Sequence, residues 1–415
     1  MFERVFKLSE HKTTVKTEVM AGITTFMTMA YILAVNPSVL GSTGMDTTAV
    51  LLATALASCL GTLCMAFMAN LPFALSAGMG LNAFMAYTVV AGYGYSWQVA
   101  LLAVFIEGLI FIVLSLTNIR EAIFNAIPLT LKKGVSVGIG LFIAFIGLQN
   151  SGLCVDSATL VGIISFPENF HTAGICALLT LIGLFFTAVF YTRKMKGAIL
   201  YGILLTWILG MLCQVTGLYV PTPDAGFYSL FPSWGMTDFS KLGLTFGQCF
   251  NVDFSAVGIV NFIVVIFSFL FVDIFDTLGT LIGVATKAKM LDKDGKLPGI
   301  KPALLADSIA TSAGAILGTS TTTTFVESAS GVAVGGRTGL TSMTTGVLFL
   351  LAVVFSPLFL TIPSFATAPA LVIVGFYMMG SALKIDFSDP SEGIPAFLTI
   401  LAMPTAYSIS EGIAI

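Results

Sequence analysis

The sequence predicts an all-α protein that crosses a membrane many times. Of its 415 residues, 57% are apolar and only 9% are charged, and the mean hydropathy is +0.99. A soluble domain carries about 25% charged residues, so this chain cannot cover a globular surface with charge. Apolar runs long enough to cross a hydrocarbon core about 30 Å thick recur along the whole length. The formal charge of -3 indicates no nucleic-acid partner.

The apolar runs and their polar breaks predict thirteen membrane spans. We place them near 19–40, 47–69, 73–93, 98–117, 133–152, 172–191, 197–217, 257–285, 301–318, 320–336, 339–360, 367–384 and 393–408. With the N-terminus inside, these spans put 17 of the 18 lysines and arginines on the cytoplasmic side and only Lys241 outside. This bias predicts a multi-pass protein of the cell (plasma) membrane with a cytoplasmic N-terminus.

The longest polar break divides the chain into two halves. We expect a first repeat over residues 1–217 with seven spans, an external connection over 218–256, and a second repeat over 257–415. Because seven is odd, a second copy of the first half enters the membrane with opposite orientation. This arrangement is typical of secondary transporters with inverted repeats.

The third segment of each half is a poor continuous helix. Pro72, Gly78 and Gly80 interrupt the first, and a β-branched threonine run over 321–324 opens the second. We expect each to begin as extended chain and to continue as a short helix, with Asn82 and Glu327 in roughly corresponding places. Irregular backbone at membrane depth is tolerated only where protein or a water-filled cavity satisfies it, so the matched pair indicates a binding site.

Carboxylates inside the spans are functional candidates because burying a charge in hydrocarbon is costly. Asp273 and Asp276 lie three residues apart, which places them on one helix face. Glu327 falls where the extended stretch becomes a helix, beside backbone N–H groups that we expect to be free. A packing role for these three acids is the alternative. For Glu107 and Asp307 we favour structural hydrogen bonding.

The same features argue against other classes of membrane protein. The spans contain no histidine, and the cysteines show no metal-ligand spacing, so we expect neither an enzyme nor a metal site. The glycine-rich run after Glu327 lacks the phosphate-binding pattern of an ATP-driven pump. A channel would need pore-lining rings built by symmetry, whereas the chain carries an inverted repeat and an acid pair.

Four segments resemble the nucleobase transporters of the nucleobase/ascorbate superfamily, in particular the Azg-like permeases for guanine, hypoxanthine and adenine. The similarity covers essentially the whole chain. The segments are GITTFMTMAYILAVNP at 22–37, SAGMGLNAF at 76–84, VDIFDTLG at 272–279 and ESASGVAVGGRTG at 327–339.

The resemblance implies fourteen spans in two inverted seven-span repeats, arranged as a core and a gate domain that interleave both repeats. It implies that spans three and ten are strand-plus-helix elements, and that the last span begins only where the chain ends, at 408–415. It also implies proton symport without a cofactor and a possible homodimer through the gate domains.

The same resemblance implies a set of substrate-binding residues. The purine is expected to contact Asp273 and Glu327, with Asn82 as a further determinant and Asp276 as an addition; Gly80 and Ser328, in the same segments, complete the set. Two acids in one cavity oppose each other's ionisation, so we expect one of them to hold the coupling proton. We assign direct purine binding to Glu327 and the proton-linked role to Asp273. Guanine and hypoxanthine are the expected substrates, with adenine, or uracil or xanthine, as alternatives.

Overall fold

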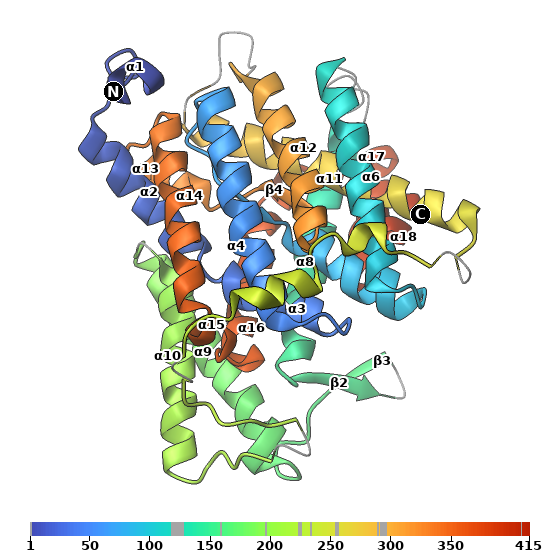
Figure 1. Ribbon diagram of the computed structural model, residues 1–415. Helices are drawn as coiled ribbons and strands as arrows, with labels where there is room; N and C mark the ends of the chain where they lie inside the picture. Colours follow the sequence, from blue (N-terminus) through green and yellow to red (C-terminus); the bar gives the residue numbers. More distant parts are fainter. Residues whose placement is uncertain are drawn as a thin grey trace.

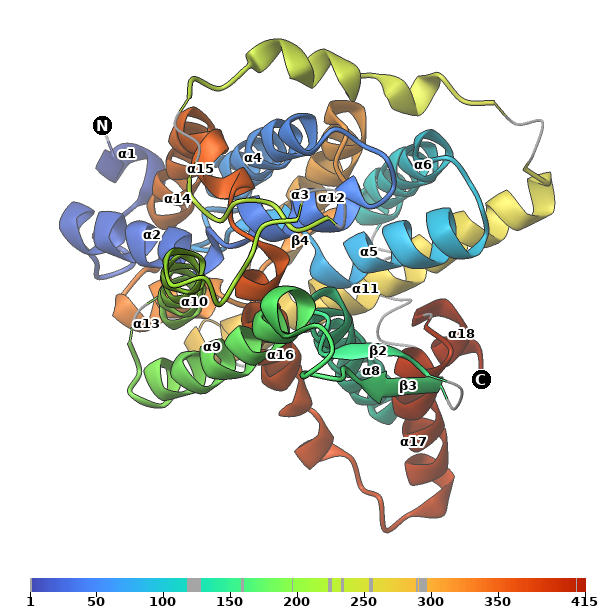
Figure 2. The ribbon, with the colours of Figure 1, turned by 90° about the horizontal axis from the view of Figure 1, so that it is seen from below.

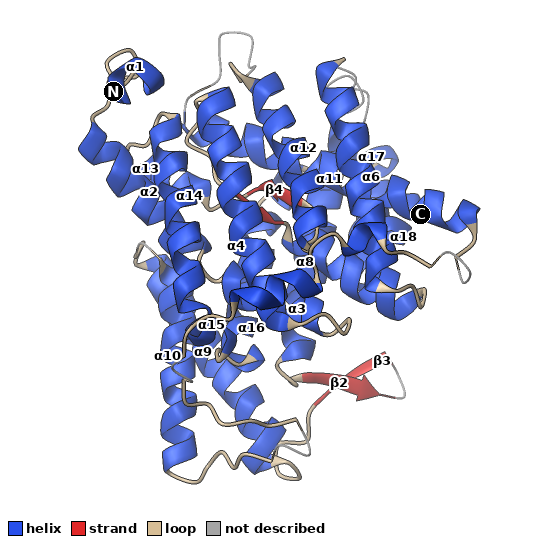
Figure 3. Ribbon diagram, viewed as in Figure 1, coloured by secondary structure: helices blue, strands red, loops and turns tan. Residues whose placement is uncertain are grey.

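The computed structural model describes residues 2–117, 128–157, 160–195, 197–222, 226–232, 235–253, 257–288, 290, 297–407 and 409–415. Helices dominate these residues (Figure 3). Within them, 10 helices are long and apolar enough to cross a membrane. The helices that form these spans are α2 (Val15–Met29) with α3 (Ile32–Gly41), α4 (Thr47–Cys64), α6 (Trp97–Leu116), α8 (Leu129–Asn150), α9 (Ile175–Thr192), α10 (Ala198–Val215), α11 (Ile259–Ala288), α12 (Ile300–Leu317), α14 (Gly339–Ala352) and α16 (Ser364–Met379).

The remaining predicted spans are shorter elements. Two of them contain the extended segments that the sequence indicates. The first runs through β1 (Leu75–Ala77), α5 (Met79–Ala83) and a π-helical stretch over Phe84–Gly92, and the second through β4 (Thr322–Thr324) and α13 (Ser328–Val334). The last predicted span corresponds to α17 (Pro390–Thr405), which is followed by α18 (Ile409–Ala414).

The spans pack as two groups. In the first, α12 packs against α4 and α6, while α14 packs against α2 and α4, and α13 lies on α2. In the second, α16 packs against α8, α9 and α10, and α17 packs against α8. Figure 2 shows α16, α8 and α17 on one side of the molecule and α4, α12 and α6 on the other. Helix α11 contacts α6, α13 and α8, and therefore touches both groups.

Small residues allow the helices to approach closely. A Cβ at Gly183 of α9 would lie 2.1 Å from Thr206 Oγ1 of α10, and one at Gly202 would lie 2.0 Å from Thr187 Oγ1. A Cβ at Gly375 would lie 2.3 Å from the Gly140 carbonyl oxygen, between α16 and α8. Close approach at small residues is the usual way in which membrane helices associate, because lipid provides no hydrophobic driving force.

Two regions outside the spans carry structure that the sequence did not indicate. Strands β2 (Cys154–Ser157) and β3 (Leu160–Ile163) form an antiparallel hairpin after α8. The connection between the halves contains short 3-10 helices, η5 (Phe239–Leu244) and η6 (Gln248–Phe250), which pack on α4 and α6. Lys241 of η5 forms an ion pair of 3.0 Å with Asp46 at the start of α4. Figure 1 shows helix α1 (Phe2–Phe6) and residues 218–222 at opposite ends of the molecule.

Candidate functional site

The two extended segments cross as an antiparallel pair inside the bundle. Leu75 pairs with Thr324, Ser76 with Thr323, and Ala77 with Thr322. The ladder continues beyond the strands, because the Gly78 N–H donates to the Thr321 carbonyl at 2.9 Å and the Phe325 N–H donates to the Ala74 carbonyl at 3.0 Å. Pairing satisfies backbone groups that hydrocarbon cannot, so each strand supports the other. The predicted strand-plus-helix form of spans three and ten is confirmed.

Glu327 lies at the beginning of α13 and is 8% exposed. Its Oε1 accepts a hydrogen bond of 2.8 Å from the hydroxyl of Tyr31, which comes from the junction between α2 and α3. The expectation of free N–H groups beside this carboxylate is met by the N–H of Glu327 itself, which bonds to the carboxylate, but not by the N–H groups that follow it. Residues 325–327 form a turn that leads into the helix, so the N–H groups of Ser328 and Ala329 already donate to carbonyls of that turn.

Asp276 links helix α11 to the crossed strands. Its Oδ2 accepts from the Thr323 hydroxyl at 3.2 Å, and a Cβ added at Gly78 would lie 3.4 Å from the same oxygen. Asp276 is also close enough to Asp273 and Glu327 to interact with both electrostatically. The structure therefore brings Asp276 of span eight and Glu327 of span ten together beside the strand crossing, with Asp273 close to Asp276.

Asp273 is fully buried and faces a different neighbour. The Thr277 hydroxyl lies 2.8 Å from Asp273 Oδ1 and 3.2 Å from each carboxylate oxygen of Asp307 on α12. A hydroxyl has one proton to donate, so it can satisfy only one of these acids at a time. Although Asp273 and Asp276 share a helix face, the first is bonded beside α12 and the second is bonded to β4.

The other predicted site residues lie close to the same crossing. Asn82 in α5 accepts a hydrogen bond from the Ser320 hydroxyl, and its Nδ2 is buried without a partner among the described residues. Ser328 accepts from the Ala74 N–H at 3.0 Å, which ties α13 to β1. Gly80 packs against the second helix group, since a Cβ there would lie 3.0 Å from Ile139 Cγ2 of α8.

Several residues at the crossing were not predicted. They are polar side chains that bond to the acids or to Asn82, namely Tyr31, Thr277, Ser320, Thr321 and Thr323. Thr321 donates to Glu107 at 2.9 Å, so Glu107 has the structural hydrogen bond that we favoured. Tyr31 could have been predicted, because it is a polar aromatic residue in the middle of an apolar span. The threonines could not, because threonine hydroxyls in membrane helices and strands commonly bond to the local backbone.

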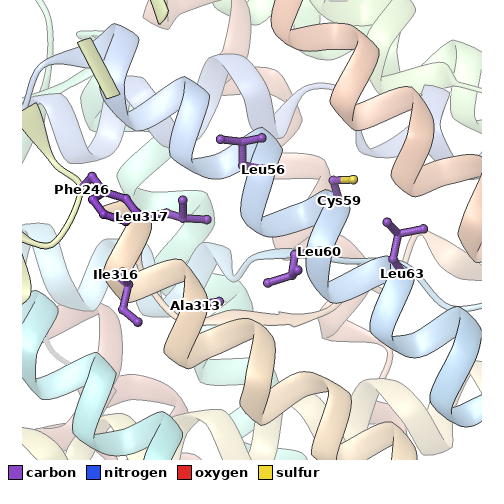
Figure 4. A pocket seen from close by; sticks show the side chains of 8 residues that line it. All are labelled: Leu56, Cys59, Leu60, Leu63, Phe246, Ala313, Ile316 and Leu317. Carbon is purple, nitrogen blue, oxygen red and sulfur yellow. The ribbon is translucent and has the colours of Figure 1, made fainter. Parts of the chain in front are cut away.

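One hollow on the described surface is apolar, and the predicted acids do not line it. It lies between α4 and α12, and its lining is Leu56, Cys59, Leu60, Leu63, Phe246, Ala313, Ile316 and Leu317 (Figure 4). The lining contains no acid, base or hydroxyl, and its one sulfur-bearing side chain is that of Cys59. Among the described residues no group of histidine, cysteine and acidic side chains could hold a metal ion.

Comparison with known proteins identifies the family. The family model Xan_ur_permease, described as the Permease family, matches residues 16–415. The chain belongs to this family. It is a membrane permease and not an enzyme. The permease is 48% identical to a putative permease of Methanocaldococcus jannaschii over 414 residues, which cover 100% of the chain and 90% of that protein.

Two further relatives have names that state a substrate. The permease is 46% identical to the guanine/hypoxanthine permease PbuG of Bacillus subtilis, over 99% of the chain and 91% of PbuG. It is 42% identical to the adenine permease AdeP of Escherichia coli, over 100% of the chain and 88% of AdeP. The two identities are too similar to separate the two specificities.

Solved structures share the fold at low sequence identity. The transmembrane domain of a cyanobacterium bicarbonate transporter, BicA, aligns with a TM-score of 0.67 at 15% identity, over 96% of this chain and 97% of BicA. The overall structure of SLC26A9 aligns with a TM-score of 0.61 at 13% identity, over 97% of this chain and 65% of that one. The predicted fold class, a polytopic helical membrane protein of two inverted repeats with a core and a gate, is confirmed.

Proposed function

We propose that this permease imports purine nucleobases across the cell membrane, with guanine and hypoxanthine preferred. The observation that carries the proposal is the gathering of Glu327, Asp276 and Asn82 at the crossing of β1 and β4. The names of the relatives PbuG and AdeP support a purine as the ligand.

The polar groups of this site suit the edge of a 6-oxopurine. Guanine and hypoxanthine carry an N1–H that can donate a hydrogen bond to an ionised carboxylate, and Glu327 provides such a carboxylate. The buried Asn82 Nδ2 is a donor that has no partner among the described residues, and the purine oxygen at C6 can accept from it. Adenine has an acceptor at N1, so a purine bound in the same pose would place an unprotonated N1 against Glu327, and its 6-amino group would face the Asn82 Nδ2 donor. Leaving a buried polar group unpaired costs about 1–3 kcal/mol, and a site of this kind can discriminate strongly. An adenine-preferring permease is the second candidate, because AdeP is almost as similar as PbuG.

We infer that transport is coupled to protons and that Asp273 holds the coupling proton. Asp273 is fully buried, shares the Thr277 hydroxyl with Asp307, and interacts electrostatically with Asp276. Several buried acids in one region oppose one another's ionisation, which favours the retention of a proton. Protonation would remove a charge that opposes movement of the loaded core through the bilayer.

The proposed orientation and assembly follow the sequence. The N-terminus and residues 193–196 are placed in the cytoplasm and residues 218–253 outside; the 287–301 loop, also assigned to the cytoplasm, lies partly outside the described residues. A homodimer through the gate domains is the proposed assembly, since the resemblance implies it.

Uptake of labelled purines tests the proposal. The gene is expressed in cells that lack their own purine permeases, and accumulation of labelled guanine, hypoxanthine, adenine, xanthine and uracil is compared with that in cells carrying an empty vector. Accumulation of guanine and hypoxanthine that collapses when the proton gradient is dissipated supports the proposal. Uptake of uracil or xanthine alone would refute the assigned substrate.

A further inference from the structure

Tyr31 donates a buried hydrogen bond to the carboxylate on which the proposed site depends. Its hydroxyl lies 2.8 Å from Glu327 Oε1, and the Tyr31 side chain is almost completely enclosed, at 1% exposure. Among the described residues, we find no other side-chain donor to this carboxylate. A hydrogen bond to an ionised acceptor is shorter and roughly twice as strong as one between neutral groups.

The first span also holds the far end of α13. Glu18 of α2 is fully buried and accepts from the N–H groups of Arg337 at 2.9 Å and Thr338 at 3.2 Å, just beyond the end of α13. Between the two ends, a Cβ at Gly331 would lie 2.1 Å from Thr25 Oγ1. Because α2 and α13 are already packed together, the Tyr31 hydroxyl is not needed to tether the helix. The hydrogen bond from the Tyr31 hydroxyl instead fixes the orientation of the Glu327 carboxylate.

We propose that Tyr31 is a positioning residue that holds Oε1 of Glu327 and leaves Oε2 to accept a hydrogen bond from the transported ligand. The inference rests on the proposed function, since it takes Glu327 as a ligand contact. Tyr31 acts through Glu327, because its hydroxyl proton is already donated to Oε1. A glutamate has three side-chain torsions, and Tyr31 orders them before the ligand arrives. Ligand binding therefore loses less conformational entropy at Glu327.

The test measures binding of labelled guanine to the purified full-length chain. Tyr31→Phe removes only the hydroxyl and is expected to raise the Kd for guanine about tenfold, which corresponds to about 1.4 kcal/mol, with a smaller change in the maximal uptake rate. Tyr31→His, whose ring N–H can still donate, should recover part of this loss. Tyr87→Phe is the matched control, because it removes a tyrosine hydroxyl that donates to Asn150 at 3.2 Å, away from the acids, and should leave the Kd unchanged.

A double variant separates positioning from a general structural role. In Glu327→Gln, Tyr31 would hold the amide oxygen and turn the NH₂ group, a donor, toward the ligand's own N–H. Adding Tyr31→Phe frees that amide to rotate, so the double variant should bind guanine at least as tightly as Glu327→Gln alone. Independent structural effects would instead add, and the double variant would bind more weakly than either single variant.

The results distinguish this inference from the proposed function. Additive losses in the double variant, or a Tyr31→Phe Kd equal to that of the unmutated protein, would overturn the positioning role and leave purine transport standing. Absence of purine binding by the unmutated protein would overturn the proposed function and this inference with it.

Discussion

Replacing Gly331 by alanine should move the proposed ligand-binding carboxylate. A Cβ at this position would lie 2.7 Å from the Ala21 carbonyl oxygen, which is backbone and cannot rotate away. Ordinary contact begins at 3.4 Å, so α13 must retreat from α2 by about 0.7 Å. A retreat of that size stretches the Tyr31–Glu327 contact from 2.8 Å to about 3.5 Å, beyond a normal O–H···O hydrogen bond. Overpacking of this kind costs about 1–3 kcal/mol of stability.

The assay combines the apparent KM for guanine uptake with thermal unfolding of the purified protein in detergent. Gly331→Ala should raise the KM and lower the unfolding temperature. Gly279→Ala is the control, since a Cβ at this exposed position of α11 meets no atom within 4 Å. Alanine there should leave stability unchanged or raise it by up to about 1 kcal/mol, because alanine favours helix more than glycine does. A Gly331→Ala protein with the KM and unfolding temperature of the unmutated chain would show that the contact between α2 and α13 does not position Glu327.

Further predictions concern the external connection and the ligand. Partial burial acts to raise the pKa of Asp46, but the Ala49 N–H and the Lys241 ammonium outweigh it and hold this pKa below its usual range. The stabilisation that this carboxylate provides is therefore present at neutral pH and is lost as the pH falls through that lowered pKa. Asp46→Ala should lower the free energy of unfolding by about 1 kcal/mol at pH 7, mainly because the helix cap is lost. Unfolding curves should show that this difference in stability between the variant and the unmutated protein becomes smaller in acid. A difference that does not change with pH would contradict this prediction. Ser240→Cys should react with an impermeant thiol reagent on intact cells and Lys194→Cys should not, while the reverse pattern would overturn the orientation. In competition assays guanine should inhibit uptake more strongly than adenine, and adenine as the best inhibitor would favour the second candidate.

Local patterns in the sequence were sufficient to predict the membrane spans and the strand-plus-helix form of spans three and ten. Pro72 and the threonine run after Ser320 disfavour helix, and the chain there is extended in the structure. The register was not predictable, because Ser76 meets Thr323 across a separation in sequence that no local pattern encodes. The same holds for Tyr31 and Glu327, which come from different repeats.

Spacing alone also could not assign partners to the two acids of α11. A separation of three residues places Asp273 and Asp276 on one face, but it does not reveal that a single threonine, Thr277, stands between Asp273 and Asp307. For a similar reason, the N–H groups of Ser328 and Ala329 are not free beside Glu327, contrary to the expectation. Backbone donors at a helix start are open only if the preceding residues do not form a turn, and residues 325–327 do.

The division of roles between Asp273 and Glu327 is tested by comparing Asp273→Asn with Glu327→Gln for both guanine binding and proton-driven guanine accumulation in reconstituted vesicles. We expect Asp273→Asn to bind guanine still but no longer to accumulate it against a gradient, because its proton site is lost. We expect Glu327→Gln to lose affinity for guanine itself. Accumulation that still depends on the proton gradient in Asp273→Asn would contradict the coupling role of Asp273, and unchanged affinity in Glu327→Gln would remove Glu327 from the binding site.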